Sequence, residues 1–241
     1  MGEPVLEVRV LHRADAEAAE AGGADRLMVV ALGEQRAHAP DPGVVAEVVR
    51  ASGLPVRPLL RLPADADRPD TTTGAGLDRM VGLAGEYVAA GADGVVAGFT
   101  TDQLEIDVEL ATALGEQLNC PWTFSRALDR TLEHRRSWRH VLGLPGVDAV
   151  LSAGSSVDAE RGHQQLLDLA GDPAIAARLV AAGGVRPEHV PWLLRARVAG
   201  VQVASAVRPG GSWTRAHVDT QLVRSWRLLL DDELAARRSR S

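Results

Sequence analysis

Two arginines follow apolar segments that have the composition of buried strands. Arg61 ends the segment VRPLLR, which starts at Val56, and Arg126 directly follows WTFS, which starts at Trp122. A guanidinium group binds the oxygens of a carboxylate or a phosphate through two parallel hydrogen bonds. Arginines at two strand ends therefore predict a site for a small anion. Asp129, three residues after Arg126, is predicted to orient that arginine by an ion pair, although it also suits a cap of the following turn.

Side chains on one side of the predicted strands complete this site. Because side chains alternate across a strand, Glu7 and Arg9 share one side of the segment VLEVRV, and Ser125 joins them if that side faces inward. Glu7 is the only well-placed carboxylate for proton transfer and is therefore the candidate catalytic residue. Neighbouring arginines favour its ionised form, which suits an electrostatic or weak-base role better than a general acid. The alternative is a structural ion pair of Glu7 with Arg9 or Arg57.

A glycine-rich turn offers a second way to bind an anion. The segment AAGGVRPEHV, from Ala181, leaves a predicted strand through Gly183 and Gly184, and SAVRPGGS starts at Ser205 after the last predicted strand. In many barrels, backbone amides after the seventh and eighth strands bind phosphate. A glycine pair in a tight turn also occurs without a ligand, so both interpretations stay open. The predicted ligand-binding residues are thus Arg61, Ser125, Arg126, Asp129, Gly183, Gly184 and Ser205.

Strand-like and helix-like segments alternate along the chain. Several of the amphipathic helical segments end at glycine, as left-handed helix caps do. Eight such strand–helix units in 241 residues favour an α/β fold, the single-domain (β/α)8 TIM barrel. An open, doubly wound sheet is the alternative, but no GxGxxG motif follows the first strand. The predicted strands are VLEVRV (5–10), DRLMVV (25–30), VRPLLR (56–61), GVVAGF (94–99), WTFSRA (122–127), DAVLSA (148–153), RLVAAG (178–183) and GVQVAS (200–205).

The predicted barrel sets where its site must lie. In TIM barrels the functional residues gather at the C-terminal ends of the strands, where Arg61, Arg126 and Ser205 fall. Residues 1–231 are predicted to form the barrel, and the Arg/Ser-rich residues 232–241 are predicted to be a disordered tail.

Composition and charge exclude several classes of function. All 26 basic residues are arginine, so the chain has neither the lysine amine of a Schiff-base enzyme nor the GK pair of a P-loop. The formal net charge of −6 gives no reason to expect a nucleic-acid partner. No apolar segment approaches the roughly 18 to 20 residues of a membrane span, and Glu3 and Pro4 do not suit a signal peptide. We therefore expect a cytoplasmic protein without a membrane partner.

Sequence motifs for metals and for catalysis are absent. Cys120 is the only cysteine, which excludes a thiolate-rich zinc or iron–sulfur site within one chain. It is expected to pack as a small buried side chain, and a copper contact between protomers is the alternative. The histidines are scattered, without HExxH or catalytic-triad motifs, and most are expected on the surface. Whether the chain catalyses a reaction therefore stays open.

The strand segments, taken in order, resemble those of the CutC family. The matching phrases run from Val5 to Ala206. They are LEV with Glu7, AGGADR (21–26), FSRALD (124–129), VLSAGSS (150–156), AAGGVRPEHV (181–190) and VASA (203–206), which contains Ser205. The resemblance implies a TIM barrel, a homodimer or larger homo-oligomer, and copper homeostasis with copper as the bound ion. It also implies that Glu7, Arg61, Arg126, Asp129 and Ser205 occupy pocket positions of the family.

The same resemblance implies that this chain has lost the metal-capable residues of the family. Arg9, Met28, Val30, Ser125 and Ala204 stand where the family carries cysteine, glutamate, cysteine, histidine and histidine. Copper(I) prefers thiolate and thioether ligands, and Cu²⁺ prefers imidazole, so no metal ligand is predicted in the barrel. Three functions remain open: a CutC-like protein of copper homeostasis, a barrel enzyme for a small anionic or phosphorylated metabolite, and a binding-only sensor or carrier.

Overall fold

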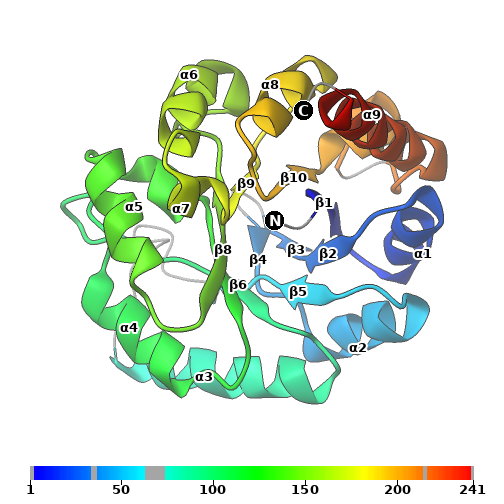
Figure 1. The fold of residues 1–241 in the computed structure, drawn as a ribbon. Helices are drawn as coiled ribbons and strands as arrows, with labels where there is room; N and C mark the ends of the chain where they lie inside the picture. The colour runs from blue at the N-terminus through cyan, green and yellow to red at the C-terminus, as the bar shows by residue number, and fades with distance from the viewer. Residues whose placement is uncertain (1–2, 34–36, 63–73, 214–215, 240–241) are drawn as a thin grey trace.

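The computed structural model describes residues 3–33, 37–62, 74–213 and 216–239. Eight parallel strands form one sheet in the order β5-β2-β1-β10-β9-β8-β7-β6, and Figure 1 shows them as a ring enclosed by helices. Each overlaps one predicted strand. The strands are β1 (Val5–Val10), β2 (Arg26–Val29), β5 (Val56–Pro58), β6 (Val95–Ala97), β7 (Trp122–Phe124), β8 (Val147–Ser152), β9 (Leu179–Ala181) and β10 (Gly200–Val203).

The two edge strands of the sheet, β5 and β6, meet and nearly close the barrel. The Leu60 amide donates to the Val96 carbonyl at 2.7 Å, and the Asp93 amide donates to the Val56 carbonyl at 3.1 Å. The predicted (β/α)8 TIM barrel is therefore confirmed.

Helices follow the strands and cover the outside of the barrel (Figure 1). Aspartates start several of them: Asp41, Asp107, Asp158 and Asp219 each accept a hydrogen bond from a backbone amide of the first turn. A short hairpin of β3 (Ala31–Leu32) and β4 (Ala37–His38) follows β2 and was not predicted. The helices are α1 (Arg13–Gly22), α2 (Pro42–Ala51), α3 (Gly74–Ala89), α4 (Val108–Gln117), α5 (His134–Leu142), α6 (Ala159–Ala170), α7 (Pro173–Ala176), α8 (Val190–Arg195) and α9 (Thr220–Arg238), with 3-10 turns η1 (Arg126–Arg130), η2 (Pro187–His189), η3 (Ser205–Val207) and η4 (Pro209–Gly211).

Two separate apolar clusters show which side of each strand faces the barrel interior. The larger cluster, which includes Leu6, Val8 and Val10 of β1, packs with apolar residues of the surrounding helices. The smaller cluster comes from alternate positions of five strands and fills the interior; it comprises Met28, Val30, Leu59, Val96, Ala149, Leu151, Val180 and Ala182. Since alternate residues face opposite sides, Glu7 and Arg9 point inward, as predicted.

An ion-pair layer occupies the interior at the N-terminal ends of the strands. Arg57 forms two hydrogen bonds of 2.6 and 2.7 Å with Asp148, a third of 2.7 Å with the Thr123 hydroxyl, and a fourth of 3.3 Å with Asp93. Asp148 and Asp93 hold the pKa of the Arg57 guanidinium above its ordinary value, against the effect of its burial. Arg57 therefore closes the end of the barrel away from the predicted site.

The C-terminal helix corrects the predicted disordered tail. α9 continues to Arg238, because its apolar spacing runs past residue 231: Trp226 and Leu230 are buried, and Leu234 packs against the core. Arg238 pairs with Glu3 at 2.6 Å. Residues 232–238 thus belong to the barrel.

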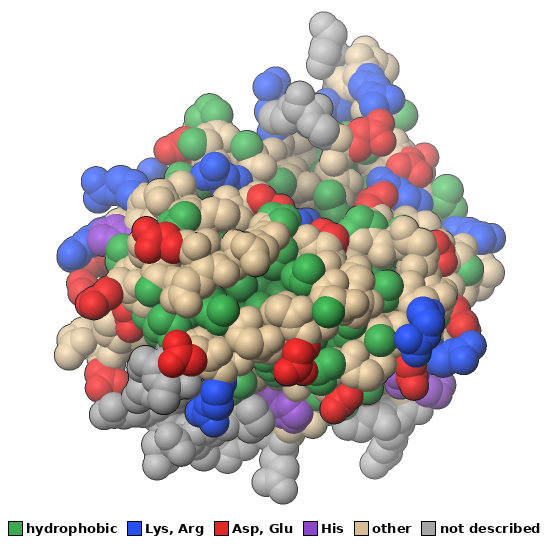
Figure 2. Space-filling view, turned by 90° about the horizontal axis from the view of Figure 1, so that it is seen from below, with side chains coloured by type: hydrophobic (Ala, Val, Ile, Leu, Met, Phe, Trp, Pro, Cys, Tyr) green, Lys and Arg blue, Asp and Glu red, His purple; other side chains and the backbone are tan. Residues whose placement is uncertain are grey.

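The outer surface is where a membrane or another protomer would contact this protein. No helix in the described part of the chain combines the length and apolar character that a bilayer span requires. Figure 2 shows the side of the barrel that α3 covers, where apolar surface is bordered by charged side chains, and Val88 of α3 is exposed. The homo-oligomer, the cytoplasmic location and the lack of a nucleic-acid partner stay predictions.

Candidate functional site

Arg126 begins the 3-10 turn that follows β7. Its Nε donates to Asp129 Oδ2 at 2.8 Å, and its Nη2 donates to the carbonyls of Ser155 and Val157 at 3.2 and 3.3 Å. Ser125 directly follows β7 and caps this turn by accepting from the Ala127 amide at 3.3 Å. The predicted orientation of Arg126 by Asp129 is therefore confirmed.

Asp129 is itself fixed from the next strand. Its carboxylate accepts from the Ser152 hydroxyl at 2.6 Å and from the Ala153 amide at 2.8 Å. Burial raises the pKa of the Asp129 carboxyl above its ordinary value, while Arg126 and these hydrogen bonds act in the opposite direction. β7 and β8 together hold the Arg126 guanidinium in one place.

The predicted glycine turn lies against that guanidinium. Gly183 and Gly184 follow β9 and both have positive φ, +81° and +79°. A Cβ on Gly183 would lie 2.3 Å from Nη1 of Arg126, whereas a Cβ on Gly184 would meet only Asp158, at 3.5 Å. A side chain at position 183 would therefore have to displace the Arg126 guanidinium. Phosphate binding by this turn stays a prediction.

Arg9 lies inside the barrel, at the C-terminal end of β1. Burial, together with the positive charges of Arg61 and Arg126, lowers the pKa of Arg9 to about 10, although Glu7 opposes this effect. Its Nε is buried without a hydrogen-bond partner in the described structure. Its guanidinium carbon lies 4.8 Å from the centre of the Trp213 ring, so an aromatic face rather than a carboxylate covers it.

Arg208 extends this group of cations toward α1. Its guanidinium carbon also lies 4.8 Å from the Trp213 ring, and its Nη2 reaches the Arg9 carbonyl at 3.5 Å. Arg208 is fully buried and pairs with the equally buried Asp15 at 2.5 Å. We call Arg9, Arg61, Arg126 and Trp213 the mouth cluster; Arg208 borders it but is neutralised by Asp15.

The remaining predicted residues follow the ends of other strands. Arg61 follows β5 and donates to the Ala37 carbonyl at 3.3 Å. Ser205 begins the turn after β10. Gly184 contacts Asp158 rather than Arg126. The structure thus brings Arg61 and Arg126 together around Arg9, while Ser205 and Gly184 lie at neighbouring strand ends.

Glu7 is engaged by partners that were not predicted. It is fully buried, and its two oxygens accept from Arg26 Nε at 2.5 Å and from Gln202 Nε2 at 2.6 Å. The expected partners were Arg9 and Arg57. Arg26 takes their place because it begins β2 on the same inward side as Met28. A catalytic role of Glu7 stays a prediction. One of its oxygens is already paired with Arg26, and the other accepts from Gln202.

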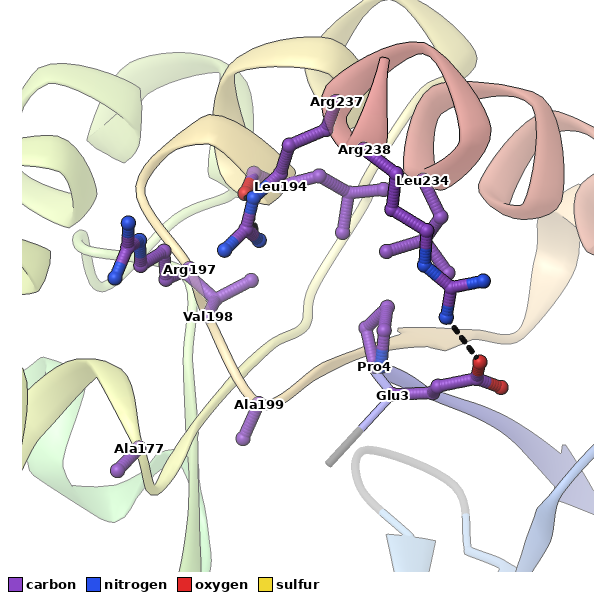
Figure 3. Close-up of a pocket in the computed structure, with 10 residues that line it drawn as sticks. All are labelled: Glu3, Pro4, Ala177, Leu194, Arg197, Val198, Ala199, Leu234, Arg237 and Arg238. Atoms are coloured by element: carbon purple, nitrogen blue, oxygen red, sulfur yellow. Dashed lines mark hydrogen bonds and ion pairs between the residues drawn. The ribbon is translucent and has the colours of Figure 1, made fainter. Parts of the chain in front are cut away.

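A pocket of about 470 Å³ lies at the opposite end of the barrel. Figure 3 shows its lining, with the ion pair of Arg238 and Glu3 at one side. The pocket includes Pro4 and Ala199, at the N-terminal ends of β1 and β10, and none of the predicted site residues. Residues at this end of a TIM barrel usually contribute to stability.

Comparisons with known proteins agree with this architecture. The model of the CutC family matches residues 5–207. The CutC family protein of Klebsiella pneumoniae strain 342 is 32% identical over 201 residues, which are 80% of this chain and 77% of that protein. That of Caulobacter vibrioides is 28% identical and covers 79% of this chain and 76% of its own length.

Solved structures agree on the fold. The putative copper homeostasis protein CutC of Streptococcus agalactiae superposes with a TM-score of 0.71 at 18% identity, over 83% of this chain and 97% of that one. Phosphoribosyl anthranilate isomerase of Thermus thermophilus reaches 0.60 at 19% identity, over 96% and 98%. These likenesses support the barrel alone.

Proposed function

The chain belongs to the CutC family, and we propose that the mouth of its barrel binds a small anion. At the level of the family, the function is copper homeostasis. The anion proposal rests on one observation: the half-buried side chain of Arg9 has a buried Nε without a hydrogen-bond partner in the described structure, and its charge lies near those of Arg61 and Arg126. A carboxylate or phosphate oxygen is the group that such a guanidinium lacks.

The carboxylates near the mouth do not supply this partner. Asp129 is hydrogen-bonded to Arg126, Asp15 to Arg208, and Glu7 to Arg26. Each of these described carboxylates is buried with an arginine of its own, and none of the three is hydrogen-bonded to Arg9. The Trp213 ring beside Arg9 leaves the guanidinium edge for in-plane hydrogen bonds.

A copper ion does not fit the same volume. At the positions where the resemblance implies metal ligands, the barrel interior carries Arg9, Met28 and Ser125. Met28 offers one thioether, which already accepts a hydrogen bond from Gln202 Nε2 at 3.1 Å. The arginines repel a cation, and copper needs several soft or imidazole donors. This supports the predicted loss of the barrel's metal ligands.

Binding without catalysis suits these residues better than an enzyme. Proton transfer needs a group whose proton is available to the ligand, and three carboxylates of the described structure around the mouth cluster, Glu7, Asp129 and Asp15, are held in ion pairs. A sensor or carrier of a carboxylated or phosphorylated metabolite is therefore the function that the geometry supports best.

Isothermal titration of the full chain with inorganic phosphate, citrate and a panel of sugar phosphates tests this proposal. We expect saturable binding of at least one anion, weakened at least tenfold in Arg9→Gln and Arg126→Gln. Arg13→Gln is the matched control, because Arg13 is exposed and forms an ion pair with the exposed Glu17. Affinity that is equal in all three variants, or no binding of any anion, would refute the proposal.

A further inference from the structure

Three potential metal ligands from distant parts of the sequence meet outside the mouth cluster. His12 follows β1, Asp15 lies in the first turn of α1, and His217 precedes α9. Their ligand atoms all lie within 4.8 Å of one another. We propose that these residues form a binding site for a divalent transition-metal ion of the Cu²⁺ and Zn²⁺ class, independent of the anion site.

The separations suit a single small ion. His217 Nδ1 lies 2.9 Å from His12 Nε2, and Asp15 Oδ1 lies 3.9 Å from His12 Nε2 and 3.8 Å from His217 Nδ1. Two nitrogen ligands at about 2.0–2.1 Å from a tetrahedral ion are about 3.3 to 3.4 Å apart. The nitrogen–nitrogen distance is shorter than that value and the two nitrogen–oxygen distances are longer, so shifts of about half an ångström complete the geometry.

Without a metal, the two imidazoles share one hydrogen bond. His12 Nδ1 also accepts from the Asp15 amide at 3.3 Å, but that amide makes a shorter bond of 3.1 Å to the His12 carbonyl. Coordination through His12 Nε2 therefore removes the proton shared by the two rings. It also breaks one long contact, that of His12 Nδ1 with the Asp15 amide.

Asp15 is held rigidly as an ionised ligand. Arg208, the Val218 amide and the Leu11 amide all donate to its carboxylate. The Arg208 and backbone hydrogen bonds keep the pKa of Asp15 below its ordinary value, although burial opposes them. Because Arg208 cancels the charge of Asp15, the two imidazoles supply most of the affinity.

This donor set selects among metal ions. Imidazole nitrogens favour Cu²⁺, Zn²⁺ and Ni²⁺, whereas Mg²⁺ and Ca²⁺ require more oxygen ligands than Asp15 provides. The Irving–Williams order places Cu²⁺ first among these divalent ions. The site is also open to solvent, since the His217 side chain is 74% exposed and that of His12 is 36% exposed. Water completes the coordination, and a bound ion exchanges readily.

The test is titration of the full chain with Cu²⁺ against glycine as competing ligand, with Zn²⁺ and Mg²⁺ in parallel. We expect one equivalent of Cu²⁺ and of Zn²⁺, no Mg²⁺, and an electron paramagnetic resonance spectrum of Cu²⁺ with two nitrogen ligands. His217→Ala and His12→Asn should each weaken binding at least tenfold; asparagine keeps a helix-capping side chain at position 12.

His163→Ala is the matched control, because His163 is exposed and not part of the cluster. His217→Ala changes an exposed side chain and should not disturb folding. It therefore tests the site even if the His12→Asn variant is unstable. Unchanged Cu²⁺ affinity in His217→Ala, or equal loss in His163→Ala, would overturn the proposal. Failure of phosphate binding leaves the metal result unaffected, because none of these variants changes the mouth cluster.

Discussion

Gly183 and Gly184 offer a matched pair of substitutions that isolates one contact. Both residues have positive φ, so alanine at either position incurs the left-handed backbone penalty of about 1–2 kcal/mol. Only at Gly183 does the new Cβ collide with Arg126, at 2.3 Å from Nη1. Gly183→Ala therefore carries a second cost that Gly184→Ala lacks.

The size of the second cost follows from what Arg126 leaves behind. Once displaced, it no longer donates to Asp129, whose side chain is 1% exposed. A hydrogen bond to a charged group is worth about 1.5–3 kcal/mol. Asp129 retains Ser152 and Ala153 as donors, and the Arg126 side chain is 31% exposed and regains water. We therefore expect the low end of that range, about 1.5 kcal/mol, as the difference between the two variants.

Urea denaturation of both variants and the wild type measures this difference, provided that the slopes agree. The same proteins are then titrated with the anion that binds wild type. We expect Gly183→Ala to lose both stability and anion affinity, and Gly184→Ala to lose only the backbone contribution. Equal destabilisation within about 0.5 kcal/mol, the usual effect of a neutral surface change, would refute the placement of Arg126 against Gly183.

Three further predictions concern the barrel ends and the two sites. Arg57→Ala removes the cation that Asp148 and Asp93 share. Because both carboxylates are more than a third exposed and regain water, we expect the free energy of unfolding, measured in urea, to fall by about 1.5 kcal/mol; a loss below about 0.5 kcal/mol would show that the pair is not structural. The pKa of Asp15 is lowered in the folded state, so its ionised carboxylate stabilises the fold above its unfolded pKa of about 3.9. This contribution to the free energy of unfolding disappears as pH falls through the folded value. The stability difference between wild type and Asp15→Asn should thus be constant above about pH 5 and shrink below pH 4; a difference that grows in acid contradicts this. Burial raises the pKa of the Cys120 thiol, so iodoacetamide at pH 8 should react with it more slowly than with a cysteine peptide, and an equal rate would contradict its burial.

Strand positions and the inward sides of the strands were predictable, because alternation of apolar residues depends only on local sequence. The pairing of Arg126 with Asp129 was predictable for the same reason, since three residues separate them. Partners that depend on the closure of the barrel were not. Arg26 reaches Glu7 only because β2 lies beside β1 in a particular register.

The histidines illustrate the same limit. No spacing rule links His12 to His217, because the cluster forms only when β10 returns beside β1 and brings the segment before α9 to α1. Most histidines were expected on the surface, and His189 is an exception, because it is buried and hydrogen-bonded to Glu160 at 2.8 Å. The end of α9 was the opposite case: its apolar spacing past residue 231 was present in the sequence and outweighs the Arg/Ser composition.

The junction of β5 and β6 differs from the other strand pairs of the barrel. Elsewhere a register of three or four paired residues joins most neighbours, whereas Leu59 and Val96 form only an isolated bridge here. Amide protons of Leu60 and Asp93 should accordingly exchange with solvent deuterium sooner than those of β1, since local opening begins where the fewest bonds must break. Arg61 directly follows this junction, so opening there would widen the entrance through which an anion reaches Arg9. The junction of the barrel that is joined by an isolated bridge thus lies beside the proposed anion site.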